Sequence, residues 1–392
     1  MACLIKSWIA TTVYIIAAAA ALSAPACQGP APSQTTLNVH TANLSLPGPP
    51  FGVVYARKDI AFAAIANGNI SVLNTSSFTP TIIRQIALPS SFISELGFGV
   101  SGLAISHNKK TLYASVGTGA VAIDVEKAVS GEAPSIAGFL NGTVGTTSIE
   151  TTVSRDDDYV FVSQEDGSDL TEAHGAVEVF HVQRAKNGSI SSIYISYITL
   201  GYAVVGSALS HDGSKLYVTS EISALNSSQG SLSILDVETL KTNPSGALLA
   251  SVDAGCSPVR VKPSPNGKTV WVNARESNKL LAFDSVKLLS NSSDALLASV
   301  QVGTSPVGLI FVNHGRHIVT ADSNRFTSAN ATSALTVVDA AAALKGKQGF
   351  PRIPAGLFPR EFTLSQNGKT LLVSDYGSDV VQAVNITQLA SV

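Results

Sequence analysis

A phrase that occurs twice constrains the fold of this chain more than any other feature. The stretches ALLASVDAGCSPV, from Ala247, and ALLASVQVGTSPV, from Ala295, share their first six residues and a Ser-Pro-Val close, and they begin 48 residues apart. Similar segments at a fixed interval are typical of repeat architectures, in which each copy builds one structural unit. We therefore expect an array of similar units rather than several unrelated domains.

A unit made of an apolar strand, a polar turn and a second apolar strand occurs seven times. The copies begin near residues 51, 100, 148, 205, 257, 305 and 358, at intervals of 48 to 57 residues. Short runs that alternate apolar and polar positions between Asn-Gly, Asp-Gly or His-Gly turns indicate antiparallel strands. Most units contain four such runs, and four-stranded units at a period near 50 residues are typical of a β-propeller. The predicted fold is all-β, a single seven-bladed propeller over residues 25–392, with a β-solenoid and two stacked sandwiches as alternatives.

The seventh unit is one strand short. It has strand-like runs over residues 360–365, 370–374 and 380–386, and the sequence then ends. Before the first unit, TTLNVHTA over residues 35–42 has strand character but belongs to no unit. We expect this segment to supply the outer strand of the seventh blade, because that pairing closes the ring and removes an exposed sheet edge.

The first residues have the layout of a secretory signal peptide. Lys6 is followed by an uncharged apolar run from Trp8 to Ala21 and then by small residues, so residues 1–24 are predicted to be removed on export. An N-terminal membrane anchor is the alternative, although the run is shorter than the roughly 20 residues that a span needs. The sequence therefore predicts a secreted, extracellular or cell-surface protein without a membrane span in the mature chain.

Two further features suit the extracellular space. Asn-x-Ser/Thr sequons for N-glycosylation are scattered over the whole length. They lie at Asn43, Asn69, Asn74, Asn141, Asn187, Asn226, Asn291, Asn330 and Asn385. Cys27 and Cys256 remain after removal of the signal peptide, and they either form a disulfide or stay as two thiols.

Composition argues against several kinds of partner. Charged residues make up 13% of the chain and the formal net charge is −2. Because there is no basic stripe and no polybasic segment, neither nucleic acid nor a membrane surface is an expected partner. GFGVSG, residues 97–102, fits a nucleotide-binding pattern by letter, but it leads into a strand rather than a helix. We predict no cofactor, and a monomer that binds a small anionic molecule or an extracellular protein or glycan.

Two units resemble a known family. SPVRVKPSPNGKTVWVNARESNKLLAFD, from Ser257, resembles the YVTN-type propeller repeat. FPREFTLSQNGKTLLVSDYGSDVVQAV, from Phe358, is similar to the last blade of the lactonase-like propellers, which include phosphogluconolactonases and a muconate-lactonizing cyclase. The resemblance implies an enzyme that acts on a small lactone or a related acid. That family typically has Pro-Arg-His-Phe where this chain has Pro-Arg-Glu-Phe, with Glu361 in place of the histidine.

Propeller topology brings the start of the first strand and the end of the second strand of each blade to one face, the channel mouth, and ligand sites favour such places. Twelve of the 52 charged residues, from 25 basic and 27 acidic ones, fall at these positions. They are Glu150, Glu165, Asp166, Glu221, Arg260, Arg275, Glu276, Asp322, Arg325, Arg360, Glu361 and Asp375. Arginines on one side and carboxylates on the other suit the clamping of an anionic substrate. The alternative interpretation is a set of solvated loop charges and ion pairs between blades.

Two functions fit this distribution. In the first, an enzyme opens or closes a small lactone or carboxylate substrate: Arg360 and Arg260 bind a carboxylate or the developing oxyanion, Glu361 or Glu276 moves the proton, and His174 assists. In the second, a non-catalytic propeller presents the mouth to an extracellular protein or glycan. Propellers host both roles, so the fold alone does not decide between them.

The acidic insertion EDGSDLTEAHG, residues 165–175, is a candidate metal site. Asp166, Asp169 and Glu172 offer oxygen ligands for calcium, but the full spacing of a calcium loop is missing, and a mobile acidic loop is the other interpretation. His107, His211 and His314 all fall in the turn between the first and second strands of a unit, so we interpret them as turn residues on the opposite face.

Overall fold

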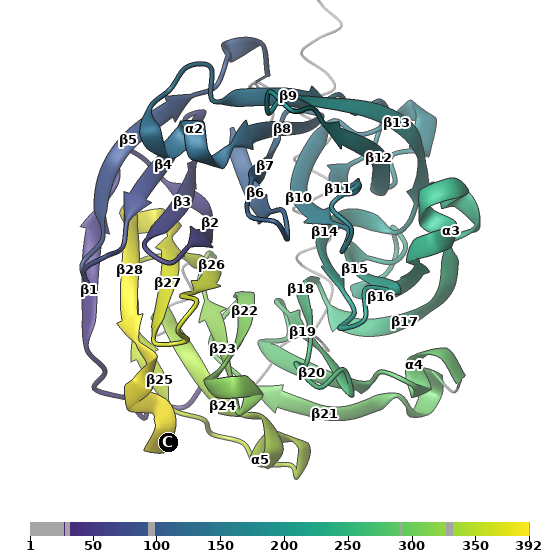
Figure 1. Cartoon of the computed structure of the whole chain (residues 1–392). Coiled ribbons are helices and arrows are strands. Elements are labelled where there is room, and N and C mark those ends of the chain that lie inside the picture. The colour runs from purple at the N-terminus through teal and green to yellow at the C-terminus, as the bar shows by residue number, and fades with distance from the viewer. Residues whose placement is uncertain (1–26, 28–31, 93–98, 291, 327–331, 392) are drawn as a thin grey trace, which may run out of the picture.

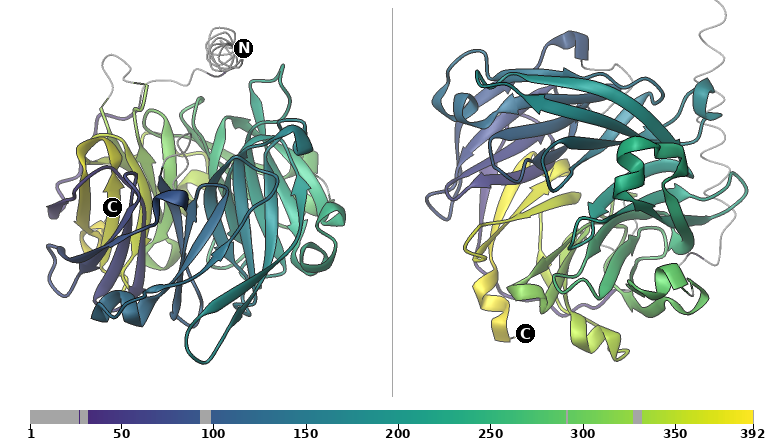
Figure 2. Two further views of the ribbon diagram at one scale, coloured as in Figure 1. Left: turned by 90° about the horizontal axis from the view of Figure 1, so that it is seen from above. Right: turned by 45° about the vertical axis from the view of Figure 1, so that its right-hand side comes forward.

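Seven four-stranded antiparallel sheets form a closed ring in the computed structural model (Figure 1). The structure describes residues 27, 32–92, 99–290, 292–326 and 332–391. Side views show the sheets arranged around a common axis (Figure 2). The predicted all-β, seven-bladed fold is therefore confirmed, and so is its closure by an N-terminal strand.

The blades are numbered in chain order, and each begins with its innermost strand. Blade 1 holds β2 (Pro50–Arg57), β3 (Ile60–Ile65), β4 (Asn69–Asn74) and β5 (Thr81–Ala87). Blade 2 holds β6 (Val100–Ile105), β7 (Thr111–Val116), β8 (Gly119–Asp124) and β9 (Ile136–Leu140). Blade 3 holds β10 (Thr147–Val153), β11 (Tyr159–Asp166), β12 (Ala176–Arg184) and β13 (Ile190–Thr199). Blade 4 holds β14 (Tyr202–Leu209), β15 (Lys215–Ile222), β16 (Gln229–Asp236) and β17 (Leu248–Cys256).

The remaining three blades complete the ring. Blade 5 holds β18 (Pro258–Pro263), β19 (Thr269–Ala274), β20 (Lys279–Asp284) and β21 (Leu296–Gln301). Blade 6 holds β22 (Pro306–Val312), β23 (His317–Asp322), β24 (Ala334–Asp339) and β25 (Arg352–Pro354). Blade 7 holds β26 (Pro359–Leu364), β27 (Thr370–Asp375), β28 (Val380–Asn385) and, on its outer edge, β1 (Thr41–Ser45).

Short helices follow the third strand of several blades. They are α2 (Val125–Ser130), α3 (Val237–Thr242), α4 (Lys287–Ser290) and α5 (Ala340–Leu344). Asp124, Asp236 and Asp339 each end a third strand and accept a hydrogen bond from a backbone N–H in the first turn of the helix that follows. This is N-capping, and it explains why each of these strands ends on aspartate.

The core lies between the blades. Every residue of β3 is buried, because the sheet of blade 1 packs against a neighbouring sheet on each face. At each interface, apolar side chains from two adjacent blades form one cluster, such as Phe62 with Leu112 between blades 1 and 2, and Trp271 with Ile318 between blades 5 and 6. Sheets covered on both faces need apolar residues at successive positions, so the second and third strands lack strict alternation.

The closing strand lies further along the chain than predicted. β1 pairs antiparallel with β28, with Thr41 opposite Val384, so residues 41–45 rather than 35–42 complete blade 7. The segment before it pairs with blade 6 instead: the N–H of Leu37 donates to the carbonyl of Arg352, and the N–H of Arg352 donates to the carbonyl of Thr35, each at 2.8 Å. Residues 35–37 and 41–45 both have strand character. Residues 35–37 pair with β25 because its free edge lies beside them, and residues 41–45 are left to pair with β28.

A disulfide joins Cys27 to Cys256, at the end of β17. Pro32 and Ser33 line a groove together with β21 and the loop before β25. We call Cys27 and residues 32–45 the N-terminal belt, because they connect to blades 4 to 7 in turn. The two cysteines therefore form a disulfide rather than two free thiols, and this bond attaches the N-terminal belt to blade 4.

The predicted signal peptide, residues 1–24, lies outside the described residues. Within the described part of the chain, no helix is long and apolar enough to cross a membrane. Among the predicted glycosylation sites, the exposed ones are Asn43, Asn141, Asn187 and Asn226, the half-buried ones are Asn69, Asn74 and Asn385, and Asn291 and Asn330 lie outside the described residues.

Candidate functional site

The seven innermost strands line the channel in the same register. In each blade one residue of the inner strand pairs with the last buried residue of the second strand, for example Pro258 with Ala274 and Pro359 with Asp375. A β-bulge follows this pair in every blade. Because a bulge inserts an unpaired residue and re-aims side chains, two consecutive residues of one strand can both contribute to the channel.

These two residues form two stacked layers. The first channel layer, nearer the mouth, consists of Phe51, Ser101, Ile149, Val205, Val259, Val307 and Arg360. The second channel layer consists of Gly52, Gly102, Glu150, Gly206, Arg260, Gly308 and Glu361. Five of the seven first-layer residues are apolar and form one buried cluster on the axis.

Four glycines of the second channel layer are required by close backbone approach. A Cβ on Gly308 would lie 2.0 Å from the carbonyl oxygen of Arg360, and a Cβ on Gly206 would lie 2.3 Å from that of Val259. No side chain fits at either position without moving the neighbouring strand. Side chains therefore reach the second layer from blades 3, 5 and 7, which carry Glu150, Arg260 and Glu361.

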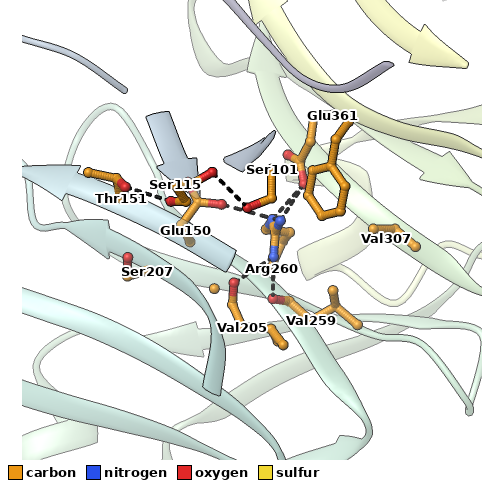
Figure 3. Close-up of polar contacts among 12 residues, drawn as sticks. Ser101, Ser115, Glu150, Thr151, Val205, Ser207, Val259, Arg260, Val307 and Glu361 are labelled. Atoms are coloured by element: carbon orange, nitrogen blue, oxygen red, sulfur yellow. Dashed lines mark hydrogen bonds and ion pairs between the residues drawn. The ribbon is translucent and has the colours of Figure 1, made fainter. Parts of the chain in front are cut away.

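These three charged side chains form one ion network across the channel (Figure 3). The Arg260 Nε and Nη2 atoms lie 2.7 and 2.6 Å from Oε1 of Glu361, and Nη2 lies 3.2 Å from Oε2 of Glu150. Its Nη1 donates to the carbonyl of Val205 at 2.7 Å. Arg260 is only 4% exposed, so its charge is satisfied almost entirely by the protein.

Burial and charge act against each other in this network. The pKa of Glu150 is raised to about 7, because burial and the charge of Glu361 outweigh the lowering effect of the Arg260 guanidinium. Burial lowers the pKa of Arg260, but the nearby Glu361 and Glu150 outweigh it and the net shift is upward. Arg260 is therefore a permanent cation between two carboxyl groups, of which Glu150 exchanges its proton near neutral pH.

Arg360 is the charged member of the first channel layer. Its guanidinium carbon lies 3.7 Å from the centroid of the Phe51 ring, 5.0 Å from that of Phe358 and 5.5 Å from that of Tyr376. Burial and, after it, the positive charge of Arg260 outweigh the opposing effect of Glu361 and lower its pKa to about 9. A buried cation surrounded by aromatic rings is the strongest electrostatic feature of the layer that faces the mouth.

A second pair of charges lies above this layer, at the ends of β15 and β19. Both terminal nitrogens of Arg275 donate to the two carboxylate oxygens of Glu221, at 2.7 and 2.6 Å. The Arg275 guanidinium also lies 5.7 Å from the centroid of Phe326. This bidentate geometry is the strongest form of a carboxylate pair, so Arg275 is committed to Glu221.

Arg325 lies on the same face and is exposed. Its guanidinium lies 5.3 Å from the centroid of Phe326 and 5.4 Å from that of Phe358. Within the described residues no carboxylate forms an ion pair with it. Arg325 is thus a cation at the mouth, supported by two aromatic rings.

Glu165, in β11, is a buried carboxyl group at the mouth. Its Oε2 atom is buried and has no hydrogen-bond partner among the described residues. Burial, with a smaller contribution from the charges of Glu221 and Asp166, raises its pKa to about 7. Arg360 and Arg275 act in the opposite direction, so this carboxyl group is within electrostatic reach of both arginines.

Two predicted mouth acids, Asp322 and Asp375, make their contacts within their own blades rather than in the channel. Asp322 accepts hydrogen bonds from the hydroxyls of Thr320 and Thr336, at 2.8 and 2.6 Å, and its Oδ2 lies 3.4 Å from the Nε of Arg352. Asp375 accepts from the backbone N–H of Gly356 at 3.1 Å. Burial raises the pKa of Asp322 to about 6 and that of Asp375 to about 7. Both side chains point to the loop that leads into their own blade.

His174 and Glu276 do not join the charged network in the contacts that the structure describes. The His174 ring stacks on Tyr202 with centroids 4.1 Å apart, and its Nδ1 lies 3.1 Å from the carbonyl of Thr171. Glu276 is exposed, and its backbone N–H donates to the carbonyl of Cys256 at 3.1 Å. The structure thus brings together Arg260 and Glu361 and places Arg360 beside them in the next layer, but it leaves His174 and Glu276 outside.

The calcium candidate finds no support in the geometry. Among the described residues there is no group of three or more His, Cys, Asp or Glu side chains placed to hold a metal ion, and this includes Asp166, Asp169 and Glu172. The insertion is instead organised by Thr171, whose hydroxyl donates to the carbonyl of His174 at 2.7 Å.

Glu150, Phe51 and Tyr376 are site residues that sequence reasoning did not assign a role. Glu150 was predicted to lie at the mouth but not to bind Arg260. An alignment of the inner strands carries the missing signal, because Glu150, Arg260 and Glu361 occupy the position that is glycine in the other four blades.

Comparisons with known proteins identify the fold. No protein-family model matches the chain, and no curated protein is significantly similar in sequence. A chain of the hydrazine synthase of Kuenenia stuttgartiensis is similar in structure, with a TM-score of 0.64 and 14% identity over 87% of this chain and 96% of that one. A chain of a mitotic checkpoint complex matches with a TM-score of 0.65 and 15% identity, over 93% and 96%. Similarity at this level of identity shows the seven-bladed fold alone, and the lactonase-like resemblance stays a prediction.

Proposed function

We propose that this chain is a secreted propeller that binds an anionic group at the channel mouth, between Arg360 and Arg325. The observation that supports this most is the Arg360 guanidinium, buried against Phe51 in a largely apolar layer, with its pKa lowered to about 9. Burial and a neighbouring positive charge make this cation costly, and a bound anion would offset that cost. Such an interaction is stronger here than in water because the surroundings are poorly polarisable.

The other two arginines of the site are less suited to a ligand. Arg260 and Arg275 already donate to protein carboxylates at 2.6 to 2.7 Å. A ligand would have to break those charge-assisted bonds, which are about twice as strong as neutral ones. Arg325 is exposed on the mouth face and Arg360 belongs to the first channel layer, nearer the mouth, so we assign the clamp to these two.

Binding of small anions tests the proposal. The purified mature protein is titrated with benzoate, acetate and inorganic phosphate by calorimetry, together with Arg360→Met and Arg325→Gln. We expect at least one anion to bind the wild type, with affinity reduced about tenfold or more in both variants, as for loss of a charge-assisted contact worth about 1.5 to 3 kcal/mol. Arg57→Gln is the matched control, because Arg57 is an exposed arginine paired with Glu126 at the end of β2. Equal affinities for all four proteins would overturn the proposal.

Glu165 favours a second candidate, a lactone-opening enzyme of the kind that the sequence resemblance implies. A carboxyl group with a pKa of about 7 and a buried unpaired oxygen is suited to accept a proton from water at neutral pH. In that reaction water attacks the lactone carbonyl, its proton passes to Glu165, and Arg360 stabilises the oxyanion. When the ring C–O bond breaks, Glu165 returns the proton to the leaving alkoxide oxygen, which gives the hydroxy acid and regenerates the base. Glu165 would then act as the base in place of Glu361, which accepts two bonds from Arg260.

A lactone panel distinguishes the two functions. The enzyme hypothesis requires hydrolysis by the wild type that is lost in Glu165→Gln and Arg360→Met, and that rises with pH through about 7 as Glu165 ionises. If no lactone is hydrolysed faster than by these variants, binding without catalysis remains.

Export and glycosylation are part of the same proposal. Full-length protein made in eukaryotic cells is expected in the medium, shortened by about the first 24 residues. Treatment with N-glycosidase should increase its mobility, with the exposed Asn141 and Asn187 as the first sites to examine. Retention in the cell at full length would contradict the assignment.

A further inference from the structure

Blades 6 and 7 share a buried aspartate that the repeat does not require. Asp322 and Asp375 each end the second strand, opposite Pro306 and Pro359 at the start of the inner strand. Both side chains are fully buried. The equivalent residues of the other five blades are uncharged: Ile65, Val116, Gln164, Ser220 and Ala274. Each aspartate is therefore a departure from the repeat, and its surroundings can be compared between the two blades.

In blade 6 the protein itself neutralises the aspartate. Oδ2 of Asp322 lies 3.4 Å from Nε of Arg352, and the hydroxyls of Thr320 and Thr336 donate to its two oxygens. Thr336 is paired with Thr320 on one side and with Arg352 on the other, so one row of residues across the sheet supplies all three contacts. A buried carboxylate requires such a cation and such donors.

Blade 7 carries the same aspartate without these partners. The positions of the two threonines and the arginine are occupied by Val373, Gln382 and Asn43. Val373 has no polar side-chain atom, and Asn43 is uncharged and exposed. Oδ1 of Asp375 and Oε1 of Gln382 are both buried, and neither has a hydrogen-bond partner among the described residues. Two buried acceptor oxygens thus stand where blade 6 has an arginine and two hydroxyl donors.

The two side chains converge on one place. Gln382 is opposite Val373, two residues before Asp375, so both side chains lie on the same face of the sheet as diagonal neighbours. Oδ2 of Asp375 accepts from the N–H of Gly356 at 3.1 Å, and Nε2 of Gln382 donates to the carbonyl of Pro354 at 3.2 Å. The remaining oxygens, Oδ1 and Oε1, therefore lie between β27, β28 and the loop that leads into blade 7. We call Asp375 and Gln382 the blade 7 corner.

We infer that the blade 7 corner binds a small monovalent metal cation, with Oδ1 of Asp375 and Oε1 of Gln382 as ligands. Buried charges in proteins are paired or coordinate a metal, and carboxylate and carbonyl oxygens suit hard cations. One carboxylate is matched by one positive charge, as Asp322 is matched by Arg352. A water molecule could donate to both oxygens, but it would leave the charge of the carboxylate uncompensated.

A divalent ion fits this corner less well. Calcium takes six to eight oxygen ligands, several of them from acids. In the part of the chain that the structure describes, no group of three or more acids, histidines or cysteines is placed to hold a metal, so Asp375 is not joined by further acids. Sodium is therefore the ion to test first.

The inference is independent of the proposed anion site, although the two are neighbours. Pro359 pairs with Asp375, and Arg360 follows Pro359 in β26. A cation at the corner would stabilise the loop of Pro354 and Gly356 and the start of the strand that carries Arg360. Without the metal ion, the Asp375 carboxyl group binds a proton instead, and burial raises its pKa to about 7. Its titration is therefore measured in sodium-free buffer.

Thermal unfolding of the purified mature protein tests the inference. Sodium-free protein at pH 8 is titrated with NaCl, while choline chloride keeps the total salt constant. We expect the melting temperature to rise by about 2 °C for each tenfold increase in sodium above its dissociation constant, for a chain of 392 residues. Asp375→Asn should abolish this response. Asp253→Asn is the matched control and should keep it, because Asp253 is an exposed aspartate on the outer strand β17.

A gain-of-function variant tests the comparison of the two blades. Asn43→Arg places a guanidinium opposite Gln382, as Arg352 stands opposite Thr336 in blade 6. It should raise the melting temperature in choline chloride and remove the response to sodium. Asn43→Gln, which removes only the glycosylation sequon, should behave as the wild type.

Four results would overturn the inference. In the first, the wild type melts at the same temperature in sodium and in choline at pH 8, which indicates that a proton or water alone satisfies the corner. In the second, CaCl₂ stabilises the protein and NaCl does not. In the third, Asp253→Asn loses the sodium response as Asp375→Asn does, and in the fourth, Asn43→Arg responds to sodium like the wild type.

Discussion

Replacing Arg260 by methionine removes the guanidinium that bridges Glu150 and Glu361 while keeping an apolar side chain in the channel. Two carboxyl groups then face each other, and the carbonyl of Val205 loses its donor at 2.7 Å. Breaking a buried ion pair by removing one partner costs about 3–5 kcal/mol. The entropy of unfolding is about 2 cal/mol/K per residue, so for 392 residues this loss lowers the melting temperature by about 4–6 °C.

The size of the effect should depend on pH. Burial raises the pKa of Glu150 to about 7 even with Arg260 present, and removing the cation raises it further. A carboxyl group whose pKa is raised in the folded protein contributes most to stability when protonated, and that contribution is lost as the pH rises through the folded value. The loss of melting temperature in Arg260→Met is therefore full near pH 8 and smaller near pH 5.5.

Thermal unfolding followed by circular dichroism measures both effects. The comparison needs the wild type, Arg260→Met, and Arg260→Met combined with Glu150→Gln and Glu361→Gln. The triple variant should recover most of the loss, because no carboxylate is left unpaired. A decrease below about 1 °C at pH 8, or a triple variant no more stable than the single one, would refute the assignment of a buried network.

Three further predictions concern single positions. Asp375→Asn should flatten the pH dependence of stability between pH 4 and 7: the folded pKa of about 7 lies above the ordinary 3.8, so the wild type loses about 4 kcal/mol as the pH rises from the ordinary pKa to the folded one, and equal slopes in chemical denaturation would contradict this. Gly308→Ala should destabilise by more than about 2 kcal/mol and weaken anion binding, because its Cβ would meet the carbonyl of Arg360 at 2.0 Å; unchanged melting and affinity would disprove the close approach. Cys256→Ser should lower stability by about 2–5 kcal/mol, as expected for a bond that closes a loop of 229 residues, and the same loss should follow reduction of the wild type but not of the variant.

The repeat in the sequence predicts the ring because each blade needs the same buried strands and turns. The twin ALLASV phrases both fall on the last strand of a blade, β17 and β21, and the Ser-Pro-Val that follows opens the next inner strand. The closing strand was misplaced because residues 35–37 and 41–45 have equal strand character. Only the positions of β25 and β28 in space decide between them.

The site was less predictable than the fold. Arg260 and Glu361 were expected at one mouth, and the structure joins them, yet strand alternation alone would place Arg360 and Glu361 on opposite faces of β26. The bulge after Pro359 allows both to contribute to the channel. The contact of Arg360 with Phe51 depends on closure of the ring between blades 7 and 1, which no local pattern encodes.

Because of the Cys27–Cys256 disulfide, the N-terminal belt and blades 1 to 4 together form a covalent ring that runs once around the propeller. From Cys27 the chain passes blades 5, 6 and 7, then builds blades 1 to 4, and the disulfide at Cys256 joins its two ends. A protease that cuts a loop of blades 1 to 4 therefore leaves both fragments bonded to each other. A cut after Cys256 separates a tail that only packing retains. In an environment with proteases, the outer loops of the first four blades can be nicked without the molecule coming apart.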